Sequence, residues 1–327
     1  MENKNKFVHL HVHSYYSSLH GLSTIKQLVD KAIACNMQGM ALTDKNMFGI
    51  KELYNYCCEV NKNKIDDEKF KPIFGCEIYC AHSDLHSRGN FLREGKGWHL
   101  ILLAKNEVGY HNLLKIVNEA WTDGYYYCPR TEHRSIEKYH EGLIATSACL
   151  AGEIPRYIQK GQLEEAEKSV EWFKNLFCDD FYIELMRHEV KDKKTQANRD
   201  IFRDQKSIEP ALIKLAQKHN VKIICTNDVY FTNEEDAETH DDMLCFAIGK
   251  EKNDPSRWYV SKQEWLKTSE EMAELFSDIP EALDNTIEIL NKVEWYNIDL
   301  FQEIPPELEG KLPYRFEQQK YGYNCYC

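Results

Sequence analysis

Hydrophobic positions along the chain follow two periods, one typical of helices and one typical of strands. Apolar residues at helical spacing predict helices at residues 25–33, 50–57, 110–120, 163–177 and 210–219. Short apolar runs between them predict buried strands at residues 40–43, 72–81, 99–104, 143–147, 181–186 and 221–226. Because short strands that alternate with helices form parallel sheets, we predict an α/β fold built on a mostly parallel sheet or barrel.

The pattern changes after residue 232, where strands stop and helical spacing continues. The clearest helices there are expected at 261–276 and 280–293. The last residues carry Pro305, Pro306 and Pro313 and read as irregular structure or a linker. We therefore predict a barrel domain at 1–232, a smaller helical appendage at 233–300 and an irregular tail at 301–327.

A further strand is predicted at residues 7–14, and its polar positions are unusual. His9, His11 and His13 occupy every second position, and aliphatic residues occupy the positions between them. Alternate side chains of a strand point to opposite faces, so the three imidazoles share one face and the aliphatic residues pack against the core on the other. A face of clustered imidazoles is typical of a metal site.

Composition narrows the class of protein. A chain of 327 residues with 43% hydrophobic content is long enough to bury a substantial core, and its 12 cysteines show no paired spacing for structural zinc. No run approaches the roughly 20 apolar residues of a membrane helix, and no signal peptide is evident. We expect reduced thiols, a cytoplasmic location and no membrane partner. The net charge of -12 argues against a surface broadly built to bind nucleic acid.

Other candidate ligands lie at or near the ends of the predicted strands. These residues are Glu77, His99, Cys149 and Asp228. Parallel barrels carry their active sites at one end of the strands, so these side chains are expected to converge with the histidines. Each one alone is as readily explained as a cap or a buried polar group of the core. The set as a whole favours a metal centre.

These residues and their surroundings resemble the PHP (polymerase and histidinol phosphatase) domain, in the version found at the start of the bacterial DNA polymerase III alpha subunit. The resemblance runs in order through the chain and covers nearly everything from residue 7 to about 300. The matching segments are residues 7–17, 41–49, 71–81, 99–106, 142–153, 225–231 and 259–293.

The resemblance implies a distorted (βα)7 barrel whose strand ends hold up to three metal ions. Carried over by position, the first ion is held by His11, His13, Glu77 and Asp228. Glu77 also bridges to a second ion, which is held with His99 and Cys149. The third ion's positions fall on His20, Lys45 and Tyr230, and the last two are residues that rarely bind metals. The segment that contains Lys45 is also one residue shorter than the family's motif.

We therefore expect two divalent ions and a degraded third site. Zinc, manganese, iron and magnesium are all compatible with the donors, and nitrogen and thiolate ligands favour zinc. The Lys45 ammonium brings positive charge to a position where the family holds a cation, and it has no lone pair to offer.

Other polar residues are candidates for functional or structural roles. His188 is a candidate catalytic residue beside Asp228, because it follows a predicted strand and would face substrate or phosphate. Arg130 and Arg187 could contact phosphate, although arginines are more often simply solvated. For His9 a supporting or core role is favoured, and His240 is expected to be structural.

The resemblance implies a role in DNA replication. A two-metal site would support 3′-5′ exonuclease or phosphoesterase activity, reduced by the loss of the third ion. DNA would then bind weakly through the metal cleft. The alternatives are a non-catalytic scaffold that contacts the polymerase III core subunits, including a proofreading exonuclease, and a stand-alone phosphatase. A polymerase palm has no room in this chain, so it should not polymerise DNA by itself.

Overall fold

The computed structural model describes residues 7–85, 96–190, 196–254 and 261–298, and its described strands form one mixed sheet. The strands run in the order β1-β2-β3-β5-β6-β7, and β4 pairs with β2. Their bounds are β1 Gly39–Leu42, β2 Lys71–Cys80, β3 Trp98–Ala104, β4 Arg130–Thr131, β5 Leu143–Thr146, β6 Phe181–Met186 and β7 Lys222–Thr226. The sheet is not uniformly parallel, because β3 pairs antiparallel with both β2 and β5.

The histidine-rich segment at 7–14 connects the two ends of this sheet. On one side Ala41 and Thr43 donate backbone hydrogen bonds to the carbonyls of His9 and Val12, both at 2.8 Å. On the other side the backbones of Val12 and Val229 form a parallel bridge. The expected regular strand is therefore reduced to a single bridge, but the segment still closes the sheet into a distorted barrel. The α/β barrel class is confirmed.

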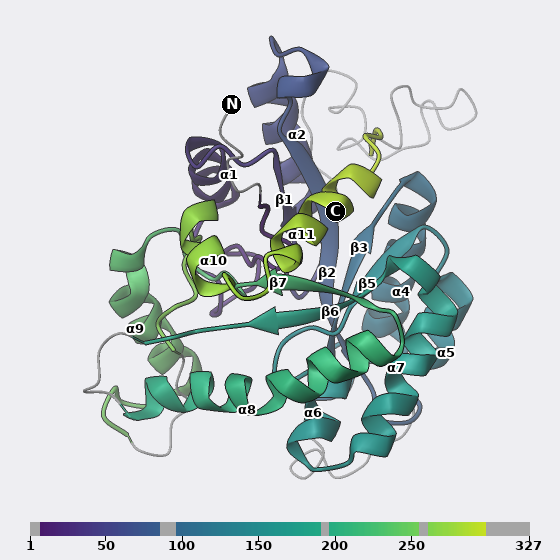
Figure 1. Cartoon of the computed structure of the whole chain (residues 1–327). Coiled ribbons are helices and arrows are strands. Elements are labelled where there is room, and N and C mark those ends of the chain that lie inside the picture. Colours follow the sequence, from purple (N-terminus) through teal and green to yellow (C-terminus); the bar gives the residue numbers. More distant parts are fainter. Residues whose placement is uncertain (1–6, 86–95, 191–195, 255–260, 299–327) are drawn as a thin grey trace. The chain divides into compact units, whose positions relative to one another are not determined.

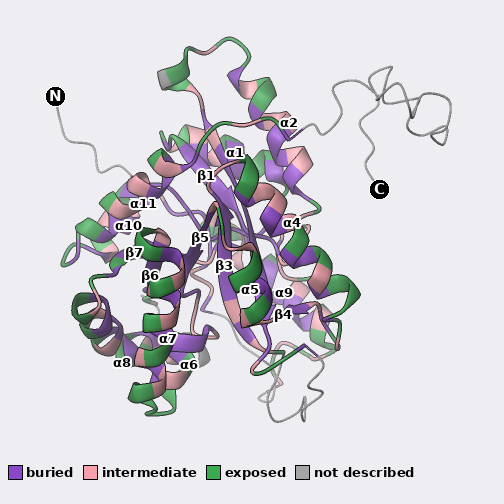
Figure 2. Cartoon of the chain, turned by 90° about the vertical axis from the view of Figure 1, so that its right-hand side faces the viewer, coloured by how far each residue is buried: buried purple, intermediate pink, exposed green. Residues whose placement is uncertain are grey.

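Helices cover the outside of the strands. Figure 1 shows this arrangement, and Figure 2 shows that buried residues are concentrated on the strands while exposed residues lie on the outer faces of helices such as α5. The helices of this part are α1 Ile25–Ala34, α2 Ile50–Asn61, α4 Glu107–Thr122, α5 His133–Tyr139, α6 Glu153–Gln159, α7 Leu163–Phe177 and α8 Gln196–Lys218, with short 3-10 turns at η1 Asp66–Glu68 and η2 Cys178–Asp180.

Local sequence explains where the first of these helices begins. Thr24 accepts a hydrogen bond from the backbone N–H of Gln27, and the Gln27 side chain accepts one from the backbone of Thr24, which forms a capping box. Ile25, Leu28 and Val29 then lie on the buried face. In the same way the predicted aliphatic face of the 7–14 segment is buried, since Val8, Leu10 and Val12 are at most 1% exposed. Both patterns read from the sequence are confirmed as core surfaces.

The helical extension after the barrel consists of η3 Glu234–Asp236, α9 Ala237–Ile248, α10 Ser269–Leu275 and α11 Glu281–Lys292. The helix predicted at 261–276 is wrong in its first half. Residues 261–268 are non-helical, and Trp265 forms a parallel bridge with Phe231. Tertiary pairing therefore overrides the helical spacing of this stretch.

Helix α11 packs directly on the barrel. The Thr286 hydroxyl accepts a hydrogen bond from the backbone N–H of Val8 at 3.2 Å, and the Asn285 amide donates to the carbonyl of Ile223 in β7 at 2.8 Å. Residues 1–295 form one compact unit, and a second unit begins at Tyr296, of which only 296–298 are described. The division expected at residue 232 stays a prediction, and the tail at 301–327 lies outside the described residues. In the described ranges, no helix is both long and apolar enough to cross a membrane.

Candidate metal centre

Three of the predicted ligands meet where the histidine segment passes the end of β7. Asp228 Oδ1 lies 3.2 Å from His11 Nε2 and 3.5 Å from His13 Nε2. Both imidazoles are fully buried, and the Asp228 side chain is 14% exposed. We call these residues the first donor group. Their facing atoms are buried without a hydrogen-bond partner among the described residues, which is the pattern that a cation would satisfy.

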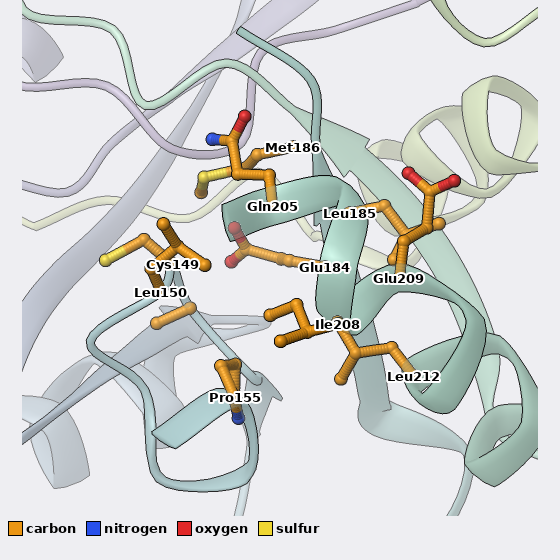
Figure 3. Close-up of a pocket in the computed structure, with 11 residues that line it drawn as sticks. Cys149, Leu150, Pro155, Glu184, Leu185, Met186, Gln205, Ile208, Glu209 and Leu212 are labelled. Carbon is orange, nitrogen blue, oxygen red and sulfur yellow. The ribbon is translucent and has the colours of Figure 1, made fainter. Parts of the chain in front are cut away.

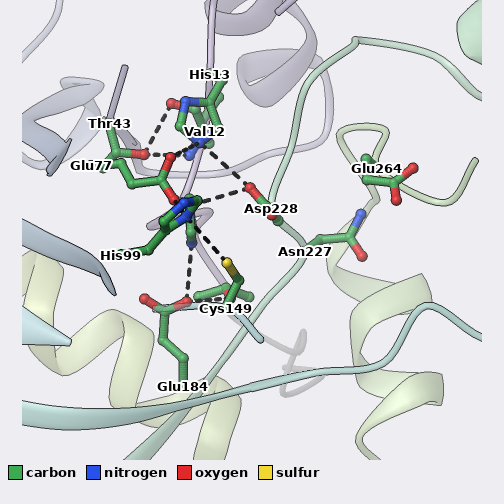
Figure 4. Close-up of polar contacts among 12 residues, drawn as sticks. Val12, His13, Thr43, Glu77, His99, Cys149, Glu184, Asn227, Asp228 and Glu264 are labelled. Carbon is green, nitrogen blue, oxygen red and sulfur yellow. Dashed lines mark hydrogen bonds and ion pairs between the residues drawn. The ribbon is translucent and has the colours of Figure 1, made fainter. Parts of the chain in front are cut away.

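The other three predicted ligands form the second donor group, which consists of Glu77, His99 and Cys149. His99 Nδ1 contacts Glu77 Oε1, and the Cys149 thiol lies 3.5 Å from the same ring nitrogen. Figure 4 shows His13 and Asp228 of the first group and the three side chains of the second group turned toward one another from separate parts of the chain. Within each group the donor atoms lie within 4.8 Å of one another. Nitrogen, oxygen and sulfur donors at this spacing fit a divalent cation.

Glu77 joins the two groups. Its Oε2 lies 3.5 Å from His13 Nε2, and its Oε1 lies 3.9 Å from His11 Nε2. The residue is placed by the pairing of β2, because its backbone N–H donates to the carbonyls of Thr43 and Asp44, both at 3.1 Å. The six residues predicted as ligands therefore lie together in the structure, and metal binding by them stays a prediction.

Backbone strain accompanies two of the donors. Asp228 has φ +46°, and Ala148, which precedes Cys149, has φ +56°. A left-handed conformation is unfavourable for a residue with a Cβ, least so for Asp and Asn, and strain of this kind gathers at functional sites. The turns after β5 and β7 therefore aim their donors at the expense of backbone energy.

The imidazole of His11 is oriented by a carboxylate that the sequence analysis missed. Its Nδ1 lies 3.1 Å from Glu184 Oε2 in the middle of β6, and Glu184 also accepts hydrogen bonds from the hydroxyls of Thr146 and Thr226. A carboxylate can only accept, so Nδ1 carries the proton and Nε2 faces Asp228. Glu184 could have been suspected from the sequence, because it is the one charged residue in the apolar run that forms β6.

His13 is oriented through a hydroxyl. Ser17 Oγ donates to Asp44 Oδ1 at 2.6 Å and therefore accepts from His13 Nδ1 at 3.0 Å. Asp44 is fixed in turn by the backbone N–H and the hydroxyl of Ser14, at 2.8 and 2.7 Å. The Nε2 atoms of both histidines are thus left free for a ligand. Ser17 and Asp44 lie in segments that resemble the family, but no role in the site was predicted for them.

Charge shapes the ionisation of the cluster. Burial by itself would lower the pKa of His11, but the carboxylates of Asp228, Glu184 and Glu77 outweigh it and raise that pKa to about 9. Burial opposes ionisation of Asp228, yet His11 and His13 hold its pKa below the usual range. The pKa of the Cys149 thiol is raised well above its ordinary value, chiefly by burial. A cation entering the cluster would have to displace protons from His11 and Cys149.

A recess lies beside the second donor group. Figure 3 shows Cys149, Leu150 and Glu184 facing Ile208 and Leu212 of α8 across this pocket. Most of its lining is aliphatic, with Glu184 and Gln205 among the exceptions. The thiol is therefore bordered by apolar side chains, which agrees with the cause of its raised pKa.

The three positions implied for a third ion do not form a donor group among the described residues. The Lys45 ammonium contacts Glu77 Oε2, and its side chain is 15% exposed. Tyr230 stacks on His13 with ring centroids 4.6 Å apart and planes 11° apart, and burial raises its pKa well above the usual value. His20 Nδ1 donates to the carbonyl of Ser18 at 3.0 Å. Neither candidate group includes any of the three.

His188 is buried and contacts the residue that precedes Asp228. Its Nε2 donates to the carbonyl of Asn227 at 3.0 Å, and its Nδ1 lies 3.5 Å from Glu264 Oε1. Asn227 is held as well, since its amide donates to the carbonyls of Gln263 and Trp265, both at 2.8 Å. In this arrangement His188 supports the turn that presents Asp228, and the catalytic role expected for it stays a prediction.

The remaining polar candidates are engaged within the protein. His9 Nε2 donates to the carbonyl of Lys267 at 2.8 Å, and burial lowers its pKa to about 4. His240 donates to the carbonyl of His20 at 2.8 Å. Arg187 is paired with Glu209 and Asp278, and Arg130 donates to the carbonyls of Gly124 and Leu85. The two guanidinium groups are thus bound by protein oxygens in place of the predicted phosphate.

Comparison with known proteins agrees with this architecture. A family model described as the PHP domain matches residues 9–188. The chain belongs to the PHP domain family. The DNA polymerase III subunit alpha of Borreliella burgdorferi is 40% identical over 97% of this chain, and that of Campylobacter jejuni is 37% identical over 95%. The corresponding protein of Treponema pallidum is 35% identical over 96%. The chain spans about a quarter of the length of these relatives.

Proposed function

We propose that this PHP domain binds two divalent cations, one at each donor group, and that Glu77 is shared between them. The observation that supports this is the set of buried, unpartnered atoms His11 Nε2, His13 Nε2 and Asp228 Oδ1, which face one another. Zinc is favoured because histidine and cysteine dominate the donors. In this proposal Asp228 is a ligand, and His188 is a positioning residue instead of the phosphate contact first expected.

We further propose that the site hydrolyses phosphoesters at the 3′ end of a DNA strand. Divalent cations at such a site would activate water and stabilise the charge that develops on the phosphoryl group. The chain's own residues contribute by holding the cations. Glu184 and Ser17 fix the imidazoles, and the left-handed turn at Asp228 aims the carboxylate. The DNA substrate is inferred from the similarity to polymerase III alpha subunits.

A non-catalytic scaffold is the second candidate, and the contact between Lys45 and Glu77 favours it. A domain whose carboxylate is already neutralised by a lysine keeps its fold without a full set of ions. Such a domain would serve the polymerase III core, including a proofreading exonuclease, by contact. A stand-alone phosphatase is less favoured, because the similarity to the alpha subunits extends beyond the barrel. The cytoplasmic location remains a prediction.

The test combines elemental analysis of bound metal with cleavage of a 5′-labelled single-stranded oligonucleotide. Asp228→Asn removes a ligand charge while keeping a residue that tolerates a left-handed backbone, so the fold should survive. Asp242→Asn, at an exposed carboxylate paired with Lys252, is the matched control. Two ions per chain and cleavage that only Asp228→Asn abolishes would support the enzyme. Cleavage absent with added zinc and manganese would exclude it and leave the scaffold.

A further inference from the structure

Lys45 places a permanent positive charge inside the candidate metal centre. Its ammonium contacts Glu77 Oε2, an oxygen of the carboxylate that joins the two donor groups. The Glu77 side chain is 2% exposed and that of Lys45 only 15%. A buried carboxylate requires a cationic or hydrogen-bonding partner, and here a side chain of the same chain supplies it.

The ammonium is held in position by its surroundings. The backbone N–H of Lys45 donates to Ser17 Oγ at 3.3 Å, which is the hydroxyl that also accepts from His13. The preceding residue, Asp44, is fixed by Ser14 and Ser17. Further out, the Lys45 ammonium lies over the ring of Tyr79, 5.4 Å from its centroid. The same polar network thus anchors a donor histidine and the lysine.

We propose that Lys45 is a built-in cation that competes with divalent ions for Glu77 and sets how strongly the centre holds them. This inference rests on the proposed metal site and deepens it. A tethered ammonium at one carboxylate oxygen repels an incoming ion and removes part of the negative charge that would attract it. Without ions, the same ammonium compensates the Glu77 charge and stabilises the fold.

The two effects have opposite signs, and this separates the proposal from a purely structural role. Removing the charge should weaken the ion-free protein, because Glu77 loses its partner. It should also strengthen ion binding, because Glu77 becomes fully available. A lysine that only supported the fold would give the first effect and either no change or a loss in ion affinity.

The experiment measures zinc binding by competition with a chromophoric chelator, and urea unfolding in excess chelator. Lys45→Met keeps the length of the side chain without its charge. We expect the urea midpoint of the ion-free protein to fall and the zinc dissociation constant to decrease by about tenfold or more, as expected for losing one nearby charge. Should Lys45→Met not fold without zinc, Lys45→Gln retains a donor for Glu77 and carries the same prediction.

Two controls are available. Lys96→Met removes an exposed lysine that also lies over the Tyr79 ring, at 5.7 Å, and should leave both measurements unchanged. Lys45→Arg retains the charge and should keep the wild-type zinc affinity. Equal or weaker zinc binding by Lys45→Met would overturn the competition and leave the proposed metal site standing.

The remaining outcomes separate the two proposals. If the wild type binds no zinc and Lys45→Met does, Lys45 has replaced the ion outright, and the metal-dependent activity proposed for the wild type is wrong. If neither protein binds zinc, both the metal site and the competition are overturned.

Discussion

The first and second donor groups hold similar ligands but differ in how firmly the protein prepares them. In the first group, Nδ1 of each histidine is hydrogen-bonded to a carboxylate or a hydroxyl, and both rings are fully buried. In the second group, a single nitrogen of His99 faces both Glu77 and Cys149, and the His99 side chain is 19% exposed. In the proposed metal centre the first group is therefore already arranged for a cation. In the second group Cys149 would have to lose its thiol proton before it could bind one.

The two halves of the site therefore differ in their supporting contacts as well as in their side chains, since only the second contains a thiol. Glu184 is the centre of that support, since it accepts from His11, Thr146 and Thr226.

Replacing Glu184 should have the largest effect, because its removal breaks the support of the first group. We expect Glu184→Ala to lower the free energy of unfolding by about 4 kcal/mol, as for a buried charge pair that loses one partner. Zinc affinity at the first group should fall by roughly 10- to 100-fold, as when a ligand's supporting carboxylate is removed. Chelator competition and urea unfolding measure the two effects.

The control for this variant is Glu209→Ala. Glu209 is also buried and charge-paired, but its partners are Arg187 and Lys206. Its loss should destabilise the fold without changing the zinc affinity. If both variants weakened zinc binding equally, general loosening of the structure would explain the effect and the comparison between the two groups would fail.

The second prediction concerns the pH dependence of stability and tests the first donor group. The pKa of His11 rises from 6.5 to about 9 on folding, so protonated His11 stabilises the ion-free protein. This contribution is complete below pH 6.5 and is lost as the pH rises through about 9. It amounts to at most about 3 kcal/mol. Unfolding in chelator at a series of pH values should therefore show stability falling across this window.

Zinc should abolish the fall, because a bound cation takes the place of the His11 proton. The variant His11→Gln should also remove most of it. A stability profile in chelator that is flat from pH 6.5 to 9 would contradict the charged state assigned to the first group.

The smallest effect is expected at the second group. Cys149→Ala removes a thiol that borders an apolar recess, so the free energy of unfolding should change by less than about 1.5 kcal/mol. The number of zinc ions bound per chain should fall by one, while the ion at the first donor group is retained. Cys57→Ala, at a fully buried cysteine of α2, is the control for the loss of a buried thiol. Loss of both ions in Cys149→Ala would show that the groups bind as a unit.

Much of the fold followed from local pattern. The helix at 25–33, its cap at Thr24 and the aliphatic face of the 7–14 segment are in place, because each depends on periodicity and capping chemistry within a few residues. One prediction failed for lack of long-range information, because residues 261–268 pair with the segment after β7 instead of forming a helix. The mostly parallel sheet is confirmed, but the sequence did not indicate that β3 runs antiparallel to β2 and β5. Strand direction depends on connections that the apolar pattern does not encode.

The candidate site divides in the same way. The six donors were named from the sequence because each lies in a recognisable segment at or near a strand end, and they do converge. Glu184, Ser17 and Asp44 were not named, since a buried carboxylate or hydroxyl gains its role only from a partner far along the chain. The contact between His188 Nε2 and the Asn227 carbonyl was likewise not predicted, and the catalytic role expected for His188 stays a prediction.

The sequence by itself determined the α/β class, the family and the chemical character of the site, because hydrophobic period and ligand type are properties of residues and their near neighbours. Tertiary structure alone decided that the Lys45 ammonium pairs with the Glu77 carboxylate. It also decided that Tyr230 stacks on His13 and that Glu184 orients His11. The separation along the chain is 32 positions for Lys45 and Glu77 and 173 positions for His11 and Glu184. It exceeds 200 positions for His13 and Tyr230. The direction and burial of these contacts, which control charge and ligand affinity, exist only once the barrel has closed.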